Sequence, residues 1–424
     1  MALSPRGQSN ADQLSIPWRF AKAHTYDPVT NPHGVISFAT AENCLIQKEL
    51  HDFIAKVSIP PVALRYAGST GGGPCLPAAF ACHINEYFAP QKPISGDDVR
   101  VTAAATALHD VLAYSLCAEG EGILTSRPYY GRFEIDFGNK SGVKVVPIDT
   151  DHDNCFERGI VEMFEGQLRK SEEEGVRIRA VLVVNPHNPL GNCYPREALI
   201  ELMRFCQRHK LHLISDEIYA LSVFEKPDFP NAAPFASALS LDTTDVIDSD
   251  LVHVIYGLSK DFGVAGLKVG CLISRNEELK KATTAVQRFC ALSGPSVVIA
   301  TQMLENREWT RSIINLSRKR LAEAYAFITG SLREMGVRYM EGGNAGFFVW
   351  VDLTQWLPPE GMKSEGATRE QMLAQKFLDH GVHLQPGEEH GRKGWFRVVF
   401  TALEKVALDE GLRRIEQTLR DVSW

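Results

Sequence analysis

A run of five apolar residues, Ala180 to Val184, limits the possible folds of this chain more than any other feature. An unbroken apolar strand is typical of a parallel sheet that is buried on both faces. Strand-like and helical segments alternate on both sides of this run, from about residue 98 to residue 274. The alternation predicts a doubly wound α/β domain with a mostly parallel sheet.

The sequence pattern also gives the approximate extent of each element. The expected strands of this domain are 101–102, 122–126, 143–148, 180–184, 211–215, 251–256 and 269–274, with helices at 105–117, 156–174 and 195–209. A long helical stretch at 302–335 leads to a second, smaller α+β unit, with strands at 347–352 and 396–400 and helices at 369–380 and 408–422. We expect an N-terminal arm and part of the small domain at 1–60, a large ligand-binding domain at 61–320 and a small domain at 321–424.

Three polar groups follow the strands of the expected sheet. Sheets of this kind bind ligands at the carboxyl ends of their strands. Asn188 follows the apolar strand, Asp216 ends the next strand, and Lys260 follows a third, before a glycine-rich turn and Lys268. Each residue also has an ordinary explanation, since loop lysines are usually surface charges, aspartates cap helices and Asn-Pro pairs mark turns.

Together, a lysine, a carboxylate and an amide at neighbouring strand ends are groups that a pyridoxal 5′-phosphate (PLP) site needs. Lys260 would form a Schiff base with the cofactor and later move a proton. The negative charge of Asp216 would keep the pyridine nitrogen protonated. The side-chain amide of Asn188 would donate a hydrogen bond to the ring hydroxyl oxygen.

Several segments resemble the signature blocks of fold-type I PLP enzymes, which have the aspartate-aminotransferase fold. These segments are NPHNPLG at 185–191, SDEIY at 215–219 and SKDFGVAGLKVG at 259–270. Within that group the chain resembles 1-aminocyclopropane-1-carboxylate (ACC) synthase and its fungal relatives. The blocks that carry this resemblance are 31–34, 41–43, 344–352 and 394–398, and it extends from about residue 31 to the end.

This resemblance implies roles for further residues. Ala105 and Thr106 would bind the cofactor phosphate at a helix N-terminus, where the helix dipole favours an anion. Tyr130 would stack on the pyridine ring, although a core aromatic at a strand end explains it equally well. Tyr219 would donate a hydrogen bond to the ring hydroxyl oxygen. Arg397 would hold the substrate α-carboxylate with two hydrogen bonds.

Some positions depart from the family pattern. Gly257 replaces the usual phosphate-binding serine and Lys268 replaces an arginine, so we expect phosphate binding to be weaker or rearranged. Glu42 keeps its place facing the substrate side chain. Tyr66 matches the tyrosine that enters the neighbouring subunit's site, which implies a homodimer with shared active sites. The glycine-rich residues 68–74 that follow it lack the ending of a phosphate-binding loop and predict a plain flexible connection.

The resemblance favours a C–S-cleaving lyase of the ACC-synthase type that acts on a sulfur-bearing amino-acid derivative. An aminotransferase that transfers the α-amino group to a 2-oxo acid is the alternative. A PLP-binding regulator is a third class, but such proteins usually carry a DNA-binding module, and this chain has no room for one.

Composition argues against several other classes of protein. A net charge of -7 and a pI near 6.0 do not suit binding to nucleic acids or anionic membranes. The nine cysteines form no CxxC pair or Cys/His cluster, so we expect neither a disulfide framework nor a metal site. No apolar stretch reaches the roughly 18 residues of a membrane span, and the N-terminus has no apolar signal core. We therefore expect a cytoplasmic enzyme.

Overall fold

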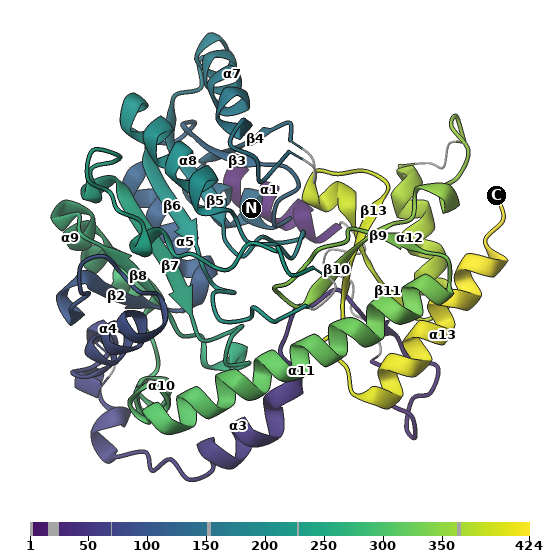
Figure 1. Ribbon diagram of the computed structural model, residues 1–424, viewed down its shortest axis with the longest axis horizontal. Helices are drawn as coiled ribbons and strands as arrows, with labels where there is room; N and C mark the ends of the chain where they lie inside the picture. The colour runs from purple at the N-terminus through teal and green to yellow at the C-terminus, as the bar shows by residue number, and fades with distance from the viewer. Residues whose placement is uncertain (1–2, 16–24, 69, 151–153, 227–228, 363–365) are drawn as a thin grey trace.

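The computed structural model describes residues 3–15, 25–68, 70–150, 154–226, 229–362 and 366–424. A seven-stranded sheet with the strand order β2-β8-β7-β6-β5-β3-β4 forms the larger part of the molecule (Figure 1). Its strands are β2 (Val99–Thr102), β3 (Gly122–Ser126), β4 (Lys144–Ile148), β5 (Ile178–Val184), β6 (His212–Asp216), β7 (Val252–Gly257) and β8 (Gly270–Ser274). Within this sheet only β8 runs antiparallel to its neighbours.

Helices cover both faces of the large sheet. Along β5, Ala180 and Leu182 pack into one hydrophobic cluster, whereas Val181 and Val183 pack into the other. The first cluster includes α5 (Ala104–Leu116), α6 (Phe133–Gly138) and α9 (Glu277–Val286). The second includes α4 (Leu76–Tyr87), α7 (Ile160–Glu173), α8 (Arg196–His209) and α10 (Gly294–Glu305). The expected doubly wound, mostly parallel sheet is therefore confirmed.

A smaller sheet, with the order β12-β13-β10-β9, lies at the other end of the molecule (Figure 1). Its strands are β9 (Arg338–Tyr339), β10 (Phe348–Asp352), β12 (Gln385–Pro386) and β13 (Trp395–Val399), and it packs with α12 (Arg369–Asp379) and α13 (Lys405–Asp421). A separate parallel pair joins β1 (Ile36–Ser37) to β11 (Val382–His383). Residues near both ends of the chain thus share one hydrophobic core.

The helical stretch expected at 302–335 is divided between two helices. It includes the end of α10 and all of α11 (Arg307–Glu334), which runs from beside the large sheet towards α13 (Figure 1). Asn306 separates the two helices, because its side chain accepts a hydrogen bond from the Trp309 amide and begins α11. Asparagine is among the preferred residues at this position of a helix.

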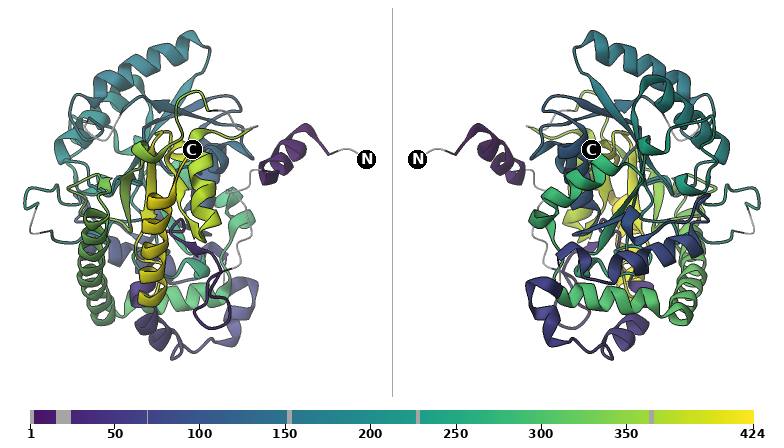
Figure 2. Two further views of the ribbon diagram at one scale, coloured as in Figure 1. Left: turned by 90° about the vertical axis from the view of Figure 1, so that its right-hand side faces the viewer. Right: turned by 90° about the vertical axis from the view of Figure 1, so that its left-hand side faces the viewer.

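The N-terminal segment begins with α1 (Pro5–Asp12), which projects away from the body of the molecule (Figure 2). Just after it, the Gln13 side chain donates a hydrogen bond of 2.9 Å to Asn139, which follows α6. Helix α3 (Gln47–Ile54) lies beside α11 (Figure 1). The Arg6 guanidinium also lies 3.9 Å from a Glu119 carboxylate oxygen, so the segment contacts the large sheet region through polar side chains.

The described part of the glycine-rich stretch forms two 3₁₀ turns, Tyr66–Gly68 and Thr70–Gly72. Gly72 is buried, and a Cβ atom built there would lie 3.1 Å from the Val101 side chain. The Gly73 amide donates a hydrogen bond of 3.0 Å to the Thr70 carbonyl. Part of the connection expected from the glycines therefore packs on β2, while its flexibility stays a prediction.

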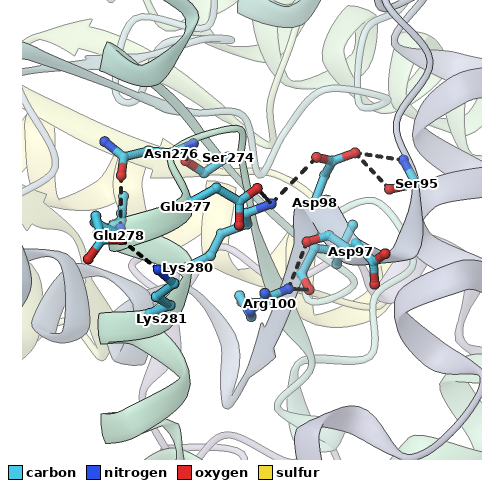
Figure 3. A network of polar contacts seen from close by, with 12 residues as sticks. Ser95, Asp97, Asp98, Arg100, Ser274, Asn276, Glu277, Glu278, Lys280 and Lys281 are labelled. Atoms are coloured by element: carbon cyan, nitrogen blue, oxygen red, sulfur yellow. Dashed lines mark hydrogen bonds and ion pairs between the residues drawn. The ribbon is translucent and has the colours of Figure 1, made fainter.

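A polar network attaches the edge strand β2 to α9 (Figure 3). The buried Lys280 amine lies 2.7 Å from a Glu277 carboxylate oxygen and 3.8 Å from one of Asp98. Asp98 also accepts hydrogen bonds from the amide and hydroxyl of Ser95, both of 2.9 Å. The network thus joins the start of β2 to α9.

Among the helices of the described residues, none is both long enough and apolar enough to pass through a membrane.

Candidate active site

A cavity of about 670 Å³ opens at the carboxyl edge of the large sheet. Residues from both sheets, from the N-terminus of α5 and from the segment after β1 line it. It contains nine of the residues predicted from the sequence: Ala105, Thr106, Tyr130, Asn188, Asp216, Tyr219, Lys260, Lys268 and Arg397. Residues that lie as far as 292 positions apart in the chain, from Ala105 to Arg397, thus meet in one site.

Lys260 lies just beyond the end of β7, with its amine inside the cavity. Its Nζ donates a hydrogen bond of 2.6 Å to the Ala41 carbonyl and lies 5.9 Å from the centre of the Tyr219 ring. Burial and the charge of Arg397 lower the pKa of Lys260 to about 8, although the charges of Glu42 and Asp216 oppose this shift. The amine can therefore be neutral near physiological pH, as a nucleophile or a base must be.

Asp216 ends β6 and is almost completely buried. One of its oxygens accepts a hydrogen bond of 3.3 Å from the Ile218 amide, and the other lies 3.3 Å from Nε2 of His109. Nδ1 of His109 lies 2.9 Å from a carboxylate oxygen of Asp136. Burial on its own lowers the pKa of His109, but hydrogen bonds to Asp136 and Asp216 and their charges outweigh burial and raise the pKa to about 9.

Arg397, on β13, is held by three acceptors. Its guanidinium donates to Asn188 Oδ1 (3.0 Å), to the Ala39 carbonyl (2.6 Å) and to the Gln385 side chain. Its Nε is buried and has no hydrogen-bond partner. Since arginine only donates, the Asn188 atom that faces it must be oxygen, and the Asn188 amide group remains available as a donor.

The N-terminus of α5 offers backbone N–H groups to the cavity. No side chain caps it, and Ala104 has a left-handed φ of 66°. A Cβ atom at Gly270 would lie 2.8 Å from the Ala104 Cα, so only glycine allows β8 to approach this turn so closely. Lys268, also left-handed with φ 56°, adds a positive charge. Strained backbone and uncapped N–H groups of this kind are typical of an anion site.

Two tyrosines form aromatic walls of the cavity. Tyr219 is buried and contacts Phe347 edge-to-face, with 5.2 Å between ring centres. Tyr130 contacts Phe133 in the same way at 5.3 Å. Burial and the charge of Asp136 raise the pKa of Tyr130 to about 12, so its hydroxyl remains neutral.

Two predicted residues do not line this cavity. Glu42 is exposed beside it, although its charge raises the pKa of Lys260. Tyr66 is 92% exposed on the surface of the subunit. A single chain therefore does not bring Tyr66 into its own site.

Gly257 has a structural reason to be glycine. An added Cβ atom would lie 2.9 Å from the Val269 carbonyl oxygen and 3.2 Å from the Gly270 Cα. The serine usual in the family would not fit here without movement of β8. Ser259, two residues later, lines the cavity and offers a hydroxyl near the same end of the strand.

The structure also brings residues into the cavity for which the sequence predicted no role. These residues are Ser37, His109, Arg132, Asp136, Ser259, His383, Gln385 and Glu389. His109 lies three residues after Thr106 and therefore on the same face of α5, a spacing that is visible in the sequence. Within the described part of the chain, no group of three or more histidine, cysteine or acidic side chains is arranged to hold a metal.

Comparison with solved structures identifies the fold. A single mutant of the Thermus thermophilus aspartate aminotransferase superposes with a TM-score of 0.73 at 19% identity, covering 99% of this chain and 100% of that chain. The aromatic aminotransferase of Pyrococcus horikoshii gives a TM-score of 0.71 at 19% identity, over 91% and 96%. At this level of identity the comparison shows the aspartate-aminotransferase fold alone.

Comparison with curated sequences gives higher identities. The chain is 32% identical to the probable aminotransferase aclI of Aspergillus oryzae over 425 residues, or 98% of each protein. It is 30% identical to the ACC synthase of Glycine max over 422 residues, covering 96% of this chain and 85% of that one. The family profile described as aminotransferase class I and II matches residues 64–415. The chain belongs to the class I and II aminotransferase family.

Class I and II aminotransferase-family proteins are PLP-dependent enzymes, and the residues of this cavity fit that cofactor. The uncapped start of α5 and the charge of Lys268 suit a phosphate. Asp136 and Asp216 share the single positive charge of His109, which leaves one negative charge to match a protonated pyridine nitrogen. The unsatisfied Arg397 Nε suits a carboxylate.

Proposed function

We propose that this chain is a PLP-dependent enzyme that removes the Cα proton of an amino-acid substrate. The observation that carries the proposal is the position of Lys260. Its amine lies in one cavity with Asp216 and Arg397, and its pKa is lowered to about 8 by burial and by the Arg397 charge. A lysine of this kind can bond to the cofactor and, once released, accept a proton.

The cofactor would be held from several sides. Ala105, Thr106, Ser259 and Lys268 would bind its phosphate at the start of α5. Asp216 would face the ring nitrogen, Tyr130 would stack on the ring, and Asn188 and Tyr219 would donate to the ring hydroxyl oxygen. When bound, PLP supplies an electron sink for negative charge at the substrate Cα.

The remaining groups orient the substrate. Arg397 would bind the α-carboxylate through its unsatisfied donors, since Asn188, Ala39 and Gln385 fix the rest of the guanidinium. This would place the Cα proton near Lys260, which would accept it as a neutral amine. Glu42 would face the substrate side chain from the rim of the cavity.

We further propose that the reaction is C–S cleavage of the ACC-synthase type on a sulfur-bearing amino-acid derivative. The support is the resemblance at 41–43, 344–352 and 394–398 and the identity to the soybean ACC synthase. A specific observation favours an aminotransferase as the second candidate. The Aspergillus oryzae relative, which matches over 98% of each protein, is named a probable aminotransferase.

The proposal includes a cytoplasmic homodimer with shared active sites. Tyr66 is 92% exposed, and Leu64 and Phe289 are 76% and 80% exposed. Large exposed apolar side chains suit a subunit interface, through which Tyr66 would enter the partner's cavity.

The cofactor bond is tested with Lys260→Ala. The variant is expected to lose the visible absorption band of the PLP-loaded protein and all turnover, because it lacks the amine that would form the bond and accept the Cα proton. Lys226→Ala, which removes a half-buried lysine that lies over the Tyr325 ring outside the cavity, is the control and should keep both. Normal turnover by Lys260→Ala would contradict the proposed function.

The two candidate reactions differ in their products. The PLP-loaded enzyme is incubated with S-adenosylmethionine, cysteine conjugates and common amino acids, while absorbance and products are followed together. Released thiol, thioether or ring product without an added 2-oxo acid supports the lyase. Accumulation of pyridoxamine phosphate, reversed by a 2-oxo acid, supports the aminotransferase instead.

A further inference from the structure

His109 lies between two buried carboxylates at the back of the cavity. Nδ1 is 2.9 Å from Asp136 and Nε2 is 3.3 Å from Asp216. The side chains of His109, Asp136 and Asp216 are only 2%, 7% and 3% exposed. Three different elements supply this group, since His109 lies on α5, Asp136 on α6 and Asp216 on β6.

The geometry fixes the protonation of His109. Ionised carboxylates only accept hydrogen bonds, so an imidazole between two of them satisfies both only when both ring nitrogens carry a proton. The resulting imidazolium is positive, in agreement with the raised pKa of His109. Removing one partner from a buried charge pair is costly, so each member requires the others.

The surroundings strengthen this arrangement. The rings of Phe133 and Phe137 lie 5.2 and 5.0 Å from the His109 ring, and they keep water away. Charges interact more strongly in such a poorly polarisable environment. Four further titratable groups feel these carboxylates: Tyr130, Tyr219, Glu217 and Lys260. Burial raises the pKa of the first three, and the charge of Asp216 adds to each shift, as does that of Asp136 for Tyr130. For Lys260, the charge of Asp216 opposes the lowering of the pKa by burial.

We infer that His109, held by Asp136, is a positioning residue that orients Asp216 and directs its negative charge at the cofactor's ring nitrogen. The inference rests on the proposed function, because it requires PLP in this cavity. His109 does not touch the substrate and acts only through Asp216. A cation behind Asp216 stabilises the ionised carboxylate. The proton between the two groups therefore stays on the ring nitrogen and does not move to Asp216.

The inference is tested on PLP-loaded enzyme with His109→Gln and His109→Asn, which keep an amide donor but carry no charge. The readout is the pH midpoint of the visible absorption band of the Lys260-bound cofactor, together with kcat. Loss of the ring-nitrogen proton removes a positive charge near the Lys260 linkage and favours its protonated form. The midpoint should therefore rise, by about one unit, and kcat should fall by one to two orders of magnitude, roughly the effect of a misplaced catalytic group.

The matched control is His253→Gln, which replaces another buried histidine with two polar partners, His212 and Ser274, outside the cavity. It should leave the midpoint unchanged. If neither His109 variant folds, Asp136→Asn is the substitute test, because it leaves the imidazole in place. It is expected to lower kcat, but by less than a change of His109 itself. In that case an Asp136→Asn enzyme with unchanged kcat would overturn the inference.

Each change is repeated in an Asp216→Asn background, where no carboxylate faces the ring nitrogen. If His109 acts through Asp216, His109→Gln should shift neither midpoint nor kcat further there. An unchanged midpoint in His109→Gln alone, or an equal shift in both backgrounds, would overturn the inference while the proposed function survives. Wild-type protein that takes up no PLP would contradict the proposed function and overturn the inference with it.

Discussion

At the residue scale, the ionisation of Lys260 gives the first prediction. Its pKa of about 8 lies below the ordinary 10.5. The rate at which PLP-free protein captures PLP should therefore rise with pH with a midpoint near 8 and level off about one to two pH units above it, because only the neutral amine attacks the aldehyde. Glu42→Gln removes a negative charge that raises this pKa, so its midpoint should move down. Stopped-flow absorbance across pH measures the midpoint for both proteins. A capture rate that still rises at pH 10 would contradict this account.

The second residue-scale prediction concerns Asp216. Asp216→Asn should still bind PLP, since the phosphate groups and Lys260 remain, but should turn over more slowly by several orders of magnitude. The reason is the loss of the negative charge that holds a proton on the ring nitrogen. Cofactor content and single-turnover rates measure the two effects separately. A variant nearly as fast as the unmodified enzyme would show that Asp216 only begins the turn after β6.

The site was predictable wherever a strand end carried the chemistry. Asn188, Asp216 and Lys260 follow strands of one sheet, so the sheet alone brings them together. His109 was not predictable as a site residue, because a histidine in an apolar helix resembles an ordinary core residue. Only the fold brings Asp136 close to it. Gln385 is also visible only in the structure, since its role is to hold Arg397.

At the scale of elements, the crowded junction of β7 and β8 gives the third prediction. Gly257→Ser restores the residue usual in the family but places a Cβ atom 2.9 Å from the Val269 carbonyl oxygen. The variant should lose about 1–3 kcal/mol of unfolding free energy, as overpacked sites do, and bind PLP less well. Gly266→Ser, where no atom lies within 4 Å of the added Cβ, is the control in denaturant unfolding. A more stable Gly257→Ser enzyme would contradict this packing.

Most strands were predictable because an apolar run between turn residues has few alternatives. The strand expected at 122–126 and the observed β3 coincide, and the other strands of this sheet differ by up to two residues at their starts. The break between α10 and α11 was missed, since helical periodicity continues across Asn306 and only its side-chain cap ends one helix and begins the next. Helix α4 was hidden by the glycines and prolines before it.

At the scale of the whole molecule, the proposed homodimer gives the fourth prediction. If Tyr66 completes the partner's cavity, Tyr66→Ala and Lys260→Ala should each be inactive, yet mixed dimers of the two should regain activity in one of their sites. That site combines an intact Lys260 from one subunit with an intact Tyr66 from the other. Activity after co-refolding, together with sedimentation of the wild type, measures this. An active monomer, or mixtures without recovery of activity, would contradict shared sites.

The division of the chain into domains at residues 60 and 320 also remains a prediction.

A bond between PLP and Lys260 is tested most directly by labelling. Borohydride reduction of the PLP-loaded enzyme fixes the cofactor to the amine that holds it, and peptide mass mapping locates the label. We predict a single phosphopyridoxyl group on Lys260, inside the peptide that contains Ser259 and Asp261, and none on Lys268. A label on Lys268 or on surface lysines, or no label, would contradict the account.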